Sequence, residues 1–176
     1  MITIIADKSN TLNQISYDKF LDNINYHQLL CSCGMSGCFN KHGYYSRSIK
    51  TSEGILTLSI LRVRCKHCGK THAIFPHVIV PYSQILLYEH ILILTAYINK
   101  TSFDPIMINI ISIDESNIRY IICKYLSHWK EIITAFGFSI ADDILALVEQ
   151  CLNTFKRQFM QIKCITNILF SNNHIS

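Results

Sequence analysis

The chain has 176 residues, of which 49% are hydrophobic and 16% charged, and this composition excludes a highly charged disordered tail. Its formal net charge of +4 is mildly basic and does not by itself establish a nucleic-acid partner. A chain of this length is expected to form one modest domain or two small ones.

The N-terminal stretch has the pattern of an ordered arm and lacks the pattern of an export signal. Residues 1–27 show weak apolar periodicity, which predicts a short helix or arm around Leu12, Ile15, Phe20, Leu21 and Ile24. The first residues lack the basic start and apolar centre of a secretion signal, and we therefore expect a cytoplasmic protein. In a reducing compartment the eight cysteines favour thiols or metal ligands over disulfides.

The next region has the pattern of strands and turns. In residues 56–63 apolar and polar residues alternate, but the alternation changes phase after residue 60. This slip predicts a β-bulge or a strand covered on both faces, with Arg62 and Arg64 projecting together beside Cys65. A third strand is expected over residues 72–75, before a proline.

The pattern then becomes helical. Residues 84–97 predict a helix capped by Ser83, with Tyr82 packing on Leu87 as a hydrophobic staple. The apolar segment 85–98 contains two ionisable residues and is shorter than the roughly 18 to 20 residues that cross a bilayer. We therefore interpret it as a core helix, and we expect no membrane association.

Two further helices predict a helix-turn-helix unit. Asp104 and Pro105 have the residue types of a helix start, and this short helix is expected to end near Ser112. Asp114 then caps a second helix that runs to about Trp129. Two helices joined by a short turn are the outline of a helix-turn-helix.

The C-terminal part predicts additional helices. Residues 130–160 have the pattern of one or two helices, broken near Gly137 and restarted around Ser139. Asp142 and Asp143 in the first turn would suit the helix dipole.

Cysteine spacing predicts a metal site. Residues 65–70 read C-x-x-C-G-K, a tight turn in which Cys65 and Cys68 direct two thiolates at one cation. Paired with cysteines about thirty residues upstream, this turn predicts a zinc ribbon with a structural Zn²⁺, since soft thiolates favour zinc over hard cations.

Spacing alone leaves a choice among the three upstream cysteines as metal ligands. Cys31 and Cys33 are separated by a single residue, a tight bite for chelation, whereas Cys33 and Cys38 have C-x4-C spacing. We therefore predict Cys33, Cys38, Cys65 and Cys68 as ligands, with Cys31 as the alternative. His42 and His67 are weaker candidates to replace a sulfur. The remaining alternative is that the cluster holds buried or free thiols without metal.

Basic residues gather around the cysteines. Residues 41–70 contain seven Lys or Arg against a single acid, Glu53. Cations and aromatic rings in this segment suit phosphate contacts and stacking, and they predict DNA contacts by Arg47, Arg62 and Arg64, although a solvated strand face has the same composition.

In the second helix of the predicted helix-turn-helix, Ile118, Ile122 and Tyr125 share one face and are expected to lie in the core. The residues on and beside the opposite face are of types that read DNA grooves, although an ordinary surface helix has the same pattern. They predict DNA contacts by Ser116, Asn117, Arg119, Tyr120 and Lys124.

Several segments carry a family resemblance. HGYYSR, RVRCKHCGKTHA, VPYSQI and RQFMQIKCITNILF resemble a bacterial family of uncharacterised proteins with a domain of unknown function, often associated with mobile elements. The CxCG…GC and CxxCGK portions are also similar to the zinc ribbon and helix-turn-helix at the front of insertion-sequence transposases. That resemblance implies binding of DNA by this region. We expect the separate RNase-H-like catalytic domain of those transposases to be absent.

The sequence therefore predicts an α+β protein with an N-terminal arm (1–27), a zinc ribbon (28–80), a helix-turn-helix module (82–135) and a helical tail (136–176). We expect a zinc-dependent protein that binds double-stranded DNA and is transposase-related or transposon-associated. The alternatives are an adaptor for a separate transposase and a transcription regulator. We expect no enzyme, because no phosphate loop, nucleophile elbow or catalytic zinc motif is present in the sequence.

Overall fold

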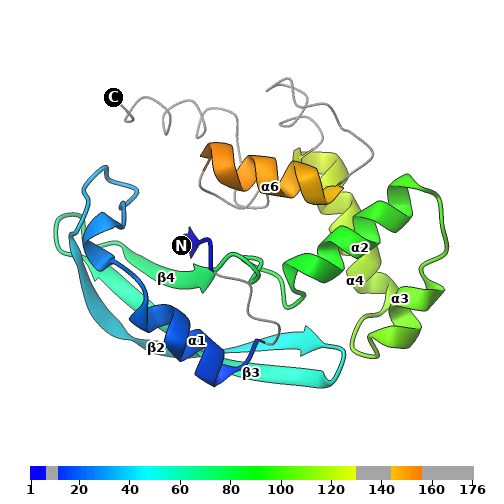
Figure 1. Cartoon of the computed structure of the whole chain (residues 1–176), viewed down its shortest axis with the longest axis horizontal. Helices are drawn as coiled ribbons and strands as arrows, with labels where there is room; N and C mark the ends of the chain where they lie inside the picture. Colours follow the sequence, from blue (N-terminus) through cyan, green and yellow to red (C-terminus); the bar gives the residue numbers. More distant parts are fainter. Residues whose placement is uncertain (7–11, 130–143, 156–176) are drawn as a thin grey trace. The chain divides into compact units, whose positions relative to one another are not determined.

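The computed structural model describes residues 1–6, 12–129 and 144–155, and all structural statements below concern these ranges (Figure 1). The fold is mixed α and β, with a four-stranded sheet and several helices. The chain divides into two compact units. The first comprises residues 1–48 and 56–77, and the second comprises residues 49–55 together with the described chain from residue 78 onward.

The sheet has the strand order β1-β4-β3-β2. Strand β1 (Ile2–Ile4) pairs in parallel with β4 (Thr71–Pro76), and β4 pairs antiparallel with β3 (Gly54–Cys65). Strand β2 (Phe39–Thr51) lies on the other side of β3. The strand predicted over residues 72–75 is confirmed as part of β4, whereas β1 was not predicted.

A tyrosine from helix α1 (Gln14–Asp22) explains the phase slip in β3. The pairing of β3 with β4 includes Arg62 opposite Ala73, and the next step would place Leu61 opposite Ile74. At that step the Tyr17 hydroxyl accepts a hydrogen bond from the Leu61 amide at 3.0 Å and donates one to the Ile74 carbonyl at 3.0 Å. The buried residues change parity at this point, from Leu58 and Ile60 to Leu61 and Val63, which confirms the predicted slip in phase.

Helix α1 confirms the predicted short helix near the N-terminus. It begins with a capping box, in which the Asn13 side chain accepts from the Ser16 amide at 2.8 Å and the Ser16 hydroxyl accepts from the Asn13 amide at 2.9 Å. Tyr17 and Leu21 are its buried residues. A 3-10 turn, η1 (Tyr26–Gln28), follows.

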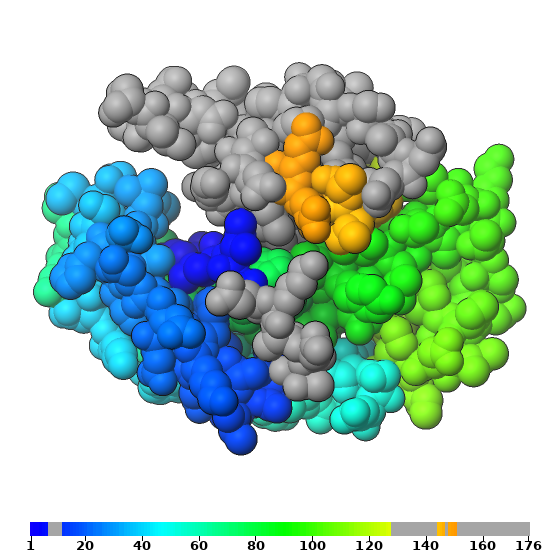
Figure 2. Space-filling model, in the orientation of Figure 1, coloured from blue at the N-terminus to red at the C-terminus, as the bar shows by residue number. Residues whose placement is uncertain are grey.

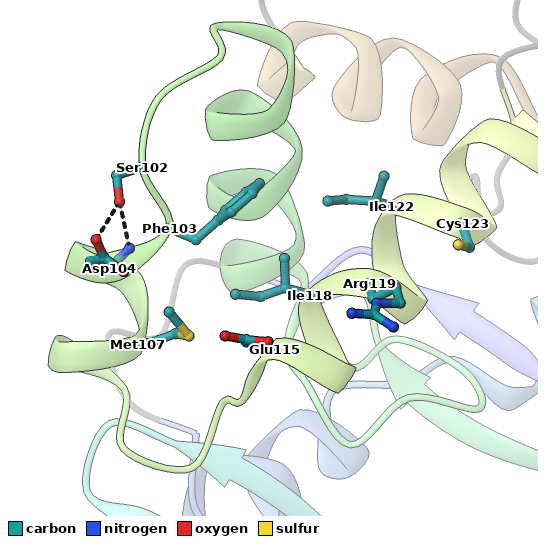
Figure 3. A pocket seen from close by; sticks show the side chains of 9 residues that line it. All are labelled: Ser102, Phe103, Asp104, Met107, Glu115, Ile118, Arg119, Ile122 and Cys123. Atoms are coloured by element: carbon teal, nitrogen blue, oxygen red, sulfur yellow. Dashed lines mark hydrogen bonds between the residues drawn. The ribbon is translucent and has the colours of Figure 1, made fainter.

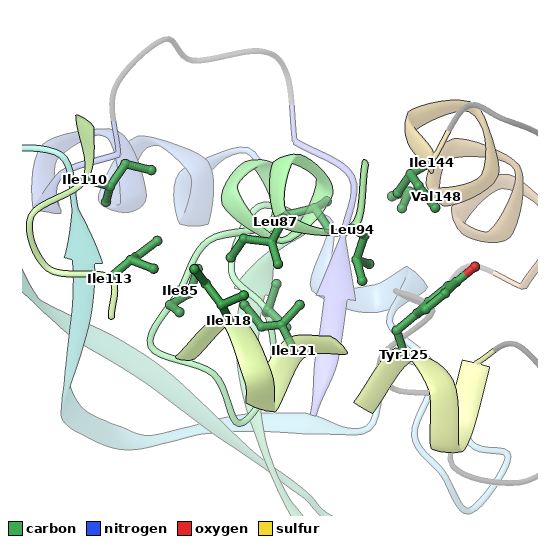
Figure 4. Close-up of a cluster of buried hydrophobic side chains, with 12 residues drawn as sticks. Ile85, Leu87, Leu94, Ile110, Ile113, Ile118, Ile121, Tyr125, Ile144 and Val148 are labelled. Carbon is green, nitrogen blue, oxygen red and sulfur yellow. The ribbon is translucent and has the colours of Figure 1, made fainter. Parts of the chain in front are cut away.

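The second unit is helical, with α2 (Leu87–Ile98), α3 (Asp104–Asn109), α4 (Glu115–Lys124) and α6 (Ile144–Phe155). A π-helical turn, η2 (Tyr125–Trp129), continues α4. Figure 4 shows the core that these helices share; it includes Leu94, Ile118, Ile121, Tyr125, Ile144 and Val148. As predicted, Ile118 and Tyr125 are buried, and Ile122 packs against them while partly exposed.

The predicted start of α2 was wrong. Helix α2 begins at Leu87, and Ser83 does not cap it. The Ser83 hydroxyl instead accepts from the Ile85 amide at 3.1 Å and lies 2.9 Å from His90 Nε2, so this polar side chain serves a buried tertiary contact. Tyr82 is exposed, with a φ of 62°, and forms no staple.

Helix α3 was predicted to end near Ser112, but it ends at Asn109. Its N-cap residue is Phe103. The predicted break near Gly137 and the restart with Asp142 and Asp143 lie outside the described residues. In the described part of the chain, no helix combines the length and the apolar character that a membrane span requires.

Candidate metal centre and DNA-contact residues

A tight turn between β3 and β4 positions the first two cysteines. The Gly69 amide donates to the Cys65 carbonyl at 3.0 Å, and the Cys65 amide donates to the Lys70 carbonyl at 2.9 Å. Gly69 has a φ of +72°, a conformation that side-chain-bearing residues adopt only with strain. The Cys68 amide donates to the Cys65 sulfur at 3.4 Å, so the backbone of the turn folds beneath the thiolates.

A second loop supplies the upstream cysteines. The Gly34 amide donates to the Cys31 carbonyl at 2.9 Å, and the Cys31 amide donates to the Met35 carbonyl at 2.8 Å, which closes the loop on itself. The Lys66 amide donates to the Cys38 carbonyl at 2.7 Å and so fastens this loop to the downstream turn. Most residues of segment 23–37 are exposed, and Figure 2 shows this segment (blue to light blue) at the surface of the first unit.

Four sulfurs have the spacing of a metal site. The thiols of Cys31, Cys33, Cys65 and Cys68 lie within 4.8 Å of one another. Cys31 Sγ lies 3.6 Å from Cys68 Sγ, and Cys33 Sγ lies 3.8 Å from Cys65 Sγ. A tetrahedral zinc with Zn–S bonds of about 2.3 Å requires edges of about 3.8 Å between its sulfurs. The four thiols could therefore hold a metal ion.

Two further donors adjoin this group. Cys38 Sγ lies 3.2 Å from Cys65 Sγ, and His72 Nε2 lies 3.3 Å from Cys31 Sγ. His72 is buried, with its ring edge-on to Phe39 at a centroid distance of 5.4 Å. Sequence reasoning missed His72; the available signal was a histidine that follows the C-x-x-C-G-K turn in a strand.

The structure thus brings all five predicted cysteines together, and the group of four contains Cys31 where the preferred prediction has Cys38. The choice between these two ligand sets stays a prediction. His42 and His67 are exposed and do not belong to the group.

The local environment differentiates the thiols. The hydrogen bond from the Cys68 amide lowers the pKa of Cys65 to about 6, and burial raises the pKa of Cys31 to about 12. Without an ion, Cys65 is therefore the thiol that ionises readily. Metal binding would release protons from the remaining thiols, because only thiolates are ligands.

The three arginines predicted to contact DNA from the first unit differ in exposure. Arg47 and Arg62 are partly buried and lie over aromatic rings, Arg47 over Phe75 at 4.9 Å and Arg62 over Tyr45 at 6.0 Å. Arg64 is exposed, and its Nε donates to the Gly69 carbonyl at 3.2 Å. Arg64 therefore presents its charge beside the metal turn, whereas the other two guanidinium groups partly pack on the sheet.

The residues predicted on the second helix lie on α4. Ser116, Arg119 and Tyr120 are exposed, and Lys124 Nζ lies over the Tyr120 ring at 5.6 Å. Asn117 has a structural contact: its Oδ1 accepts from Lys50 Nζ at 2.8 Å and completes the capping box of α4. The Ser116 hydroxyl donates to the Asp114 carboxylate at 2.5 Å, so the exposed face of α4 offers chiefly Arg119 and Tyr120 to a ligand.

A pocket with a volume of about 460 Å³ lies between α3 and α4. Figure 3 shows Phe103, Met107, Ile118 and Ile122 on its apolar side, with Glu115 and Arg119 also lining it. Sequence reasoning did not predict this pocket, because its residues come from two separate segments, 102–107 and 115–123.

Comparisons with known proteins place this site within a family. No curated protein matches the chain, and no solved structure matches it. The model of a domain of unknown function, DUF6431, matches residues 31–120, just over half of the chain, including the five clustered cysteines and most of α4. The chain belongs to the family of this domain of unknown function, DUF6431.

Proposed function

We propose that this protein binds double-stranded DNA and that a structural zinc ion in its cysteine cluster stabilises it. The observation that carries the metal part is the group of four thiols within 4.8 Å of one another. Four protein ligands would close a tetrahedral site and leave no position for a substrate, so the ion would be structural, and the role that we propose is binding and not catalysis.

The ligand chemistry supports zinc. Thiolates are soft ligands, and tetrahedral sites with four sulfurs favour zinc or iron over hard cations such as magnesium. His72 beside Cys31 would serve as a hydrogen-bond partner that orients the thiolate, in the way that outer-shell groups orient metal ligands.

The exposed residues of α4 support the DNA part. Arg119 is exposed and has no ion pair among the described residues, and Ser116 and Tyr120 flank it on the same face. Arginine reads guanine through paired hydrogen bonds, and serine and tyrosine bond phosphates and base edges. Exposed cations near the metal turn, Arg64, Lys66 and Lys70, would contact phosphates.

The proposal includes an accessory role in transposition or in transcription in the cytoplasm. It rests on the similarity of the cysteine motifs to those of transposase N-terminal regions. In such a role the protein would recognise a DNA site, and a separate transposase would carry out strand transfer.

The zinc part is tested by metal analysis of the purified full-length protein. We expect stoichiometric zinc, and we expect Cys68→Ser to lose it. Cys123→Ser is the matched control, because Cys123 is an exposed thiol on α4 and belongs to the helical unit. A zinc-free wild-type protein that is folded would refute this part.

The DNA part is tested by selection from random duplexes with the zinc-loaded protein. We expect an enriched sequence, and Arg119→Ala should weaken binding to it by about 1–3 kcal/mol and relax specificity at a single base position. Lys19→Ala, an exposed cation on α1, serves as the control. Enrichment of no sequence would contradict site-specific binding.

A second candidate function is that of an adaptor that docks another protein, and the apolar side of the α3/α4 pocket favours it. Ile108 on α3 and Ile111, two residues after the end of that helix, are 74% and 87% exposed, so two large apolar side chains of this segment are open to solvent. Ile111→Ser should abolish capture of such a partner and leave DNA affinity unchanged. Loss of DNA affinity with no captured partner would exclude the adaptor.

A further inference from the structure

The cysteine cluster contains one thiol more than a tetrahedral ion needs. Cys38 lies outside the group of four sulfurs that are mutually within 4.8 Å. Its sulfur is nevertheless 3.2 Å from Cys65 Sγ, closer than the 3.6 and 3.8 Å that separate the sulfurs within the group. Cys38 is therefore adjacent to a metal ligand without belonging to the set of four.

The backbone holds this pair close together. The Lys66 amide donates to the Cys38 carbonyl at 2.7 Å, so the start of β2 is bonded to the residue that follows Cys65. A disulfide has an S–S bond of about 2.05 Å, so the two sulfurs need to approach by only about 1.1 Å from 3.2 Å. Small side-chain rotations at the ends of two neighbouring strands can supply this approach.

The other sulfur pairs are not poised in the same way. When an ion is bound, it holds its ligands about 3.8 Å apart along each tetrahedral edge and engages a lone pair of each sulfur. Cys38 carries neither constraint. It is also the more accessible member of the close pair, at 9% exposure against 1% for Cys65.

We propose that Cys38 and Cys65 form a redox-modification site, at which a hydroperoxide converts the two thiols to a disulfide and thereby releases the metal. This inference rests on the proposed structural metal site. It assigns the ligands as Cys31, Cys33, Cys65 and Cys68, and it gives Cys38 the role of the partner that removes Cys65 from the ion.

The chemistry balances in two steps. Cys38 first gives its proton to solvent, and its thiolate attacks one peroxide oxygen: an S–O bond forms, the O–O bond breaks, and the leaving hydroxide takes a proton from solvent to become water. The Cys65 thiolate then attacks the Cys38 sulfur, an S–S bond forms, and the sulfenic oxygen leaves as hydroxide, which a proton from solvent converts to water. The two sulfurs lose two electrons, and the peroxide gains them.

Metal loss follows from the ligand count. Once Cys65 is in a disulfide, the group retains Cys31, Cys33 and Cys68, and its tetrahedron is incomplete. Affinity falls because disulfide sulfur is not a thiolate ligand. Reduction with a dithiol in the presence of zinc would restore the site, because both the sulfenic acid and the disulfide can be reduced back to thiols.

The test treats the zinc-loaded full-length protein with hydrogen peroxide. Zinc release is followed with a chromogenic chelator, and the disulfide is located by mass spectrometry of alkylated peptides. We expect a Cys38–Cys65 disulfide to accumulate in proportion to the zinc released. Cys38→Ser should hold zinc at the wild-type stoichiometry and release it at least tenfold more slowly, whereas Cys123→Ser should behave as the wild type.

Three results would overturn the inference. They are a Cys38→Ser protein that folds but lacks zinc, a disulfide between another pair, and zinc release from Cys38→Ser as fast as from the wild type. Cys38→Ala provides a second variant where the serine hydroxyl disturbs folding, which far-ultraviolet circular dichroism reports. If the wild type carries no zinc, the metal proposal fails by itself; a Cys38–Cys65 disulfide mapped in the metal-free protein would still support the redox pair.

Discussion

The Tyr17 hydroxyl should contribute strongly to the stability of the metal-bearing unit. Tyr17 is fully buried, and its hydroxyl joins the Leu61 amide and the Ile74 carbonyl where β3 and β4 separate. Tyr17→Phe keeps the ring and leaves both backbone groups without this partner. A buried polar group without a partner costs about 1–3 kcal/mol, so with two such groups the variant should lose about 2–6 kcal/mol in total.

Urea unfolding with zinc and reductant held constant measures this loss, and amide hydrogen exchange at Leu61 localises it. A loss of about 2 kcal/mol corresponds to roughly 30-fold faster exchange at Leu61 if exchange proceeds through unfolding of this unit. Tyr26→Phe is the matched control, because the Tyr26 hydroxyl makes a longer bond of 3.4 Å to the Leu21 carbonyl and is partly exposed. The reasoning is refuted if Tyr17→Phe costs no more than Tyr26→Phe.

Three further variants test the fold and the site. Burial lowers the pKa of His90 to about 3, so the unfolded state binds more protons between pH 3 and about 6.5, and stability falls as pH falls through that window. His90→Gln should remove about 2 kcal/mol of this loss between pH 7 and pH 5, measured by urea unfolding at both pH values; an unchanged pH slope would contradict the burial argument. Lys50→Met should destabilise the helical unit by about 1–2 kcal/mol in thermal unfolding, because its bond to Asn117 is charge-assisted, whereas Lys19→Met should change little. Gly37→Ala should weaken zinc binding, because Gly37 has a φ of +62° and a Cβ there would lie 3.1 Å from the His27 carbonyl oxygen. A competition titration measures the zinc affinity, and Ser36→Ala, at an exposed neighbouring position, should leave that affinity unchanged.

Local patterns predicted the parts of the fold that local forces determine. The C-x-x-C-G-K turn requires only that its own backbone hydrogen bonds close beneath two sulfurs, and the predicted capping residue Asp114 acts within a single turn of helix. The pairing of β1 with β4 and the insertion of Tyr17 join residues more than fifty positions apart, and no local pattern reports them. Ser83 illustrates the conflict: its residue type favours a helix cap, but its hydroxyl is used by buried His90.

The upstream cysteines show what a spacing argument leaves out. The spacing argument assumed that neighbouring ligands must approach the ion as one chelating pair, which disfavours Cys31 with Cys33. In the structure the loop turns between them, and each faces a different downstream sulfur, Cys31 towards Cys68 and Cys33 towards Cys65. The single intervening residue therefore does not keep either thiol out of the group, because all four sulfurs lie within 4.8 Å of one another.

The contacts of Asn117 bear on how α4 would recognise DNA. Asn117 was predicted to read bases, yet its Oδ1 accepts from Lys50 and completes the N-terminal cap of the helix. A side chain with two structural hydrogen bonds would give up both on turning to a base edge, and about 1 kcal/mol or more per bond opposes that exchange. The first turn of α4 is therefore better suited to fix the helix in place. In the proposed complex, sequence reading would fall to Arg119 and Tyr120 in the second turn, where exposed side chains can turn to a base without breaking the cap.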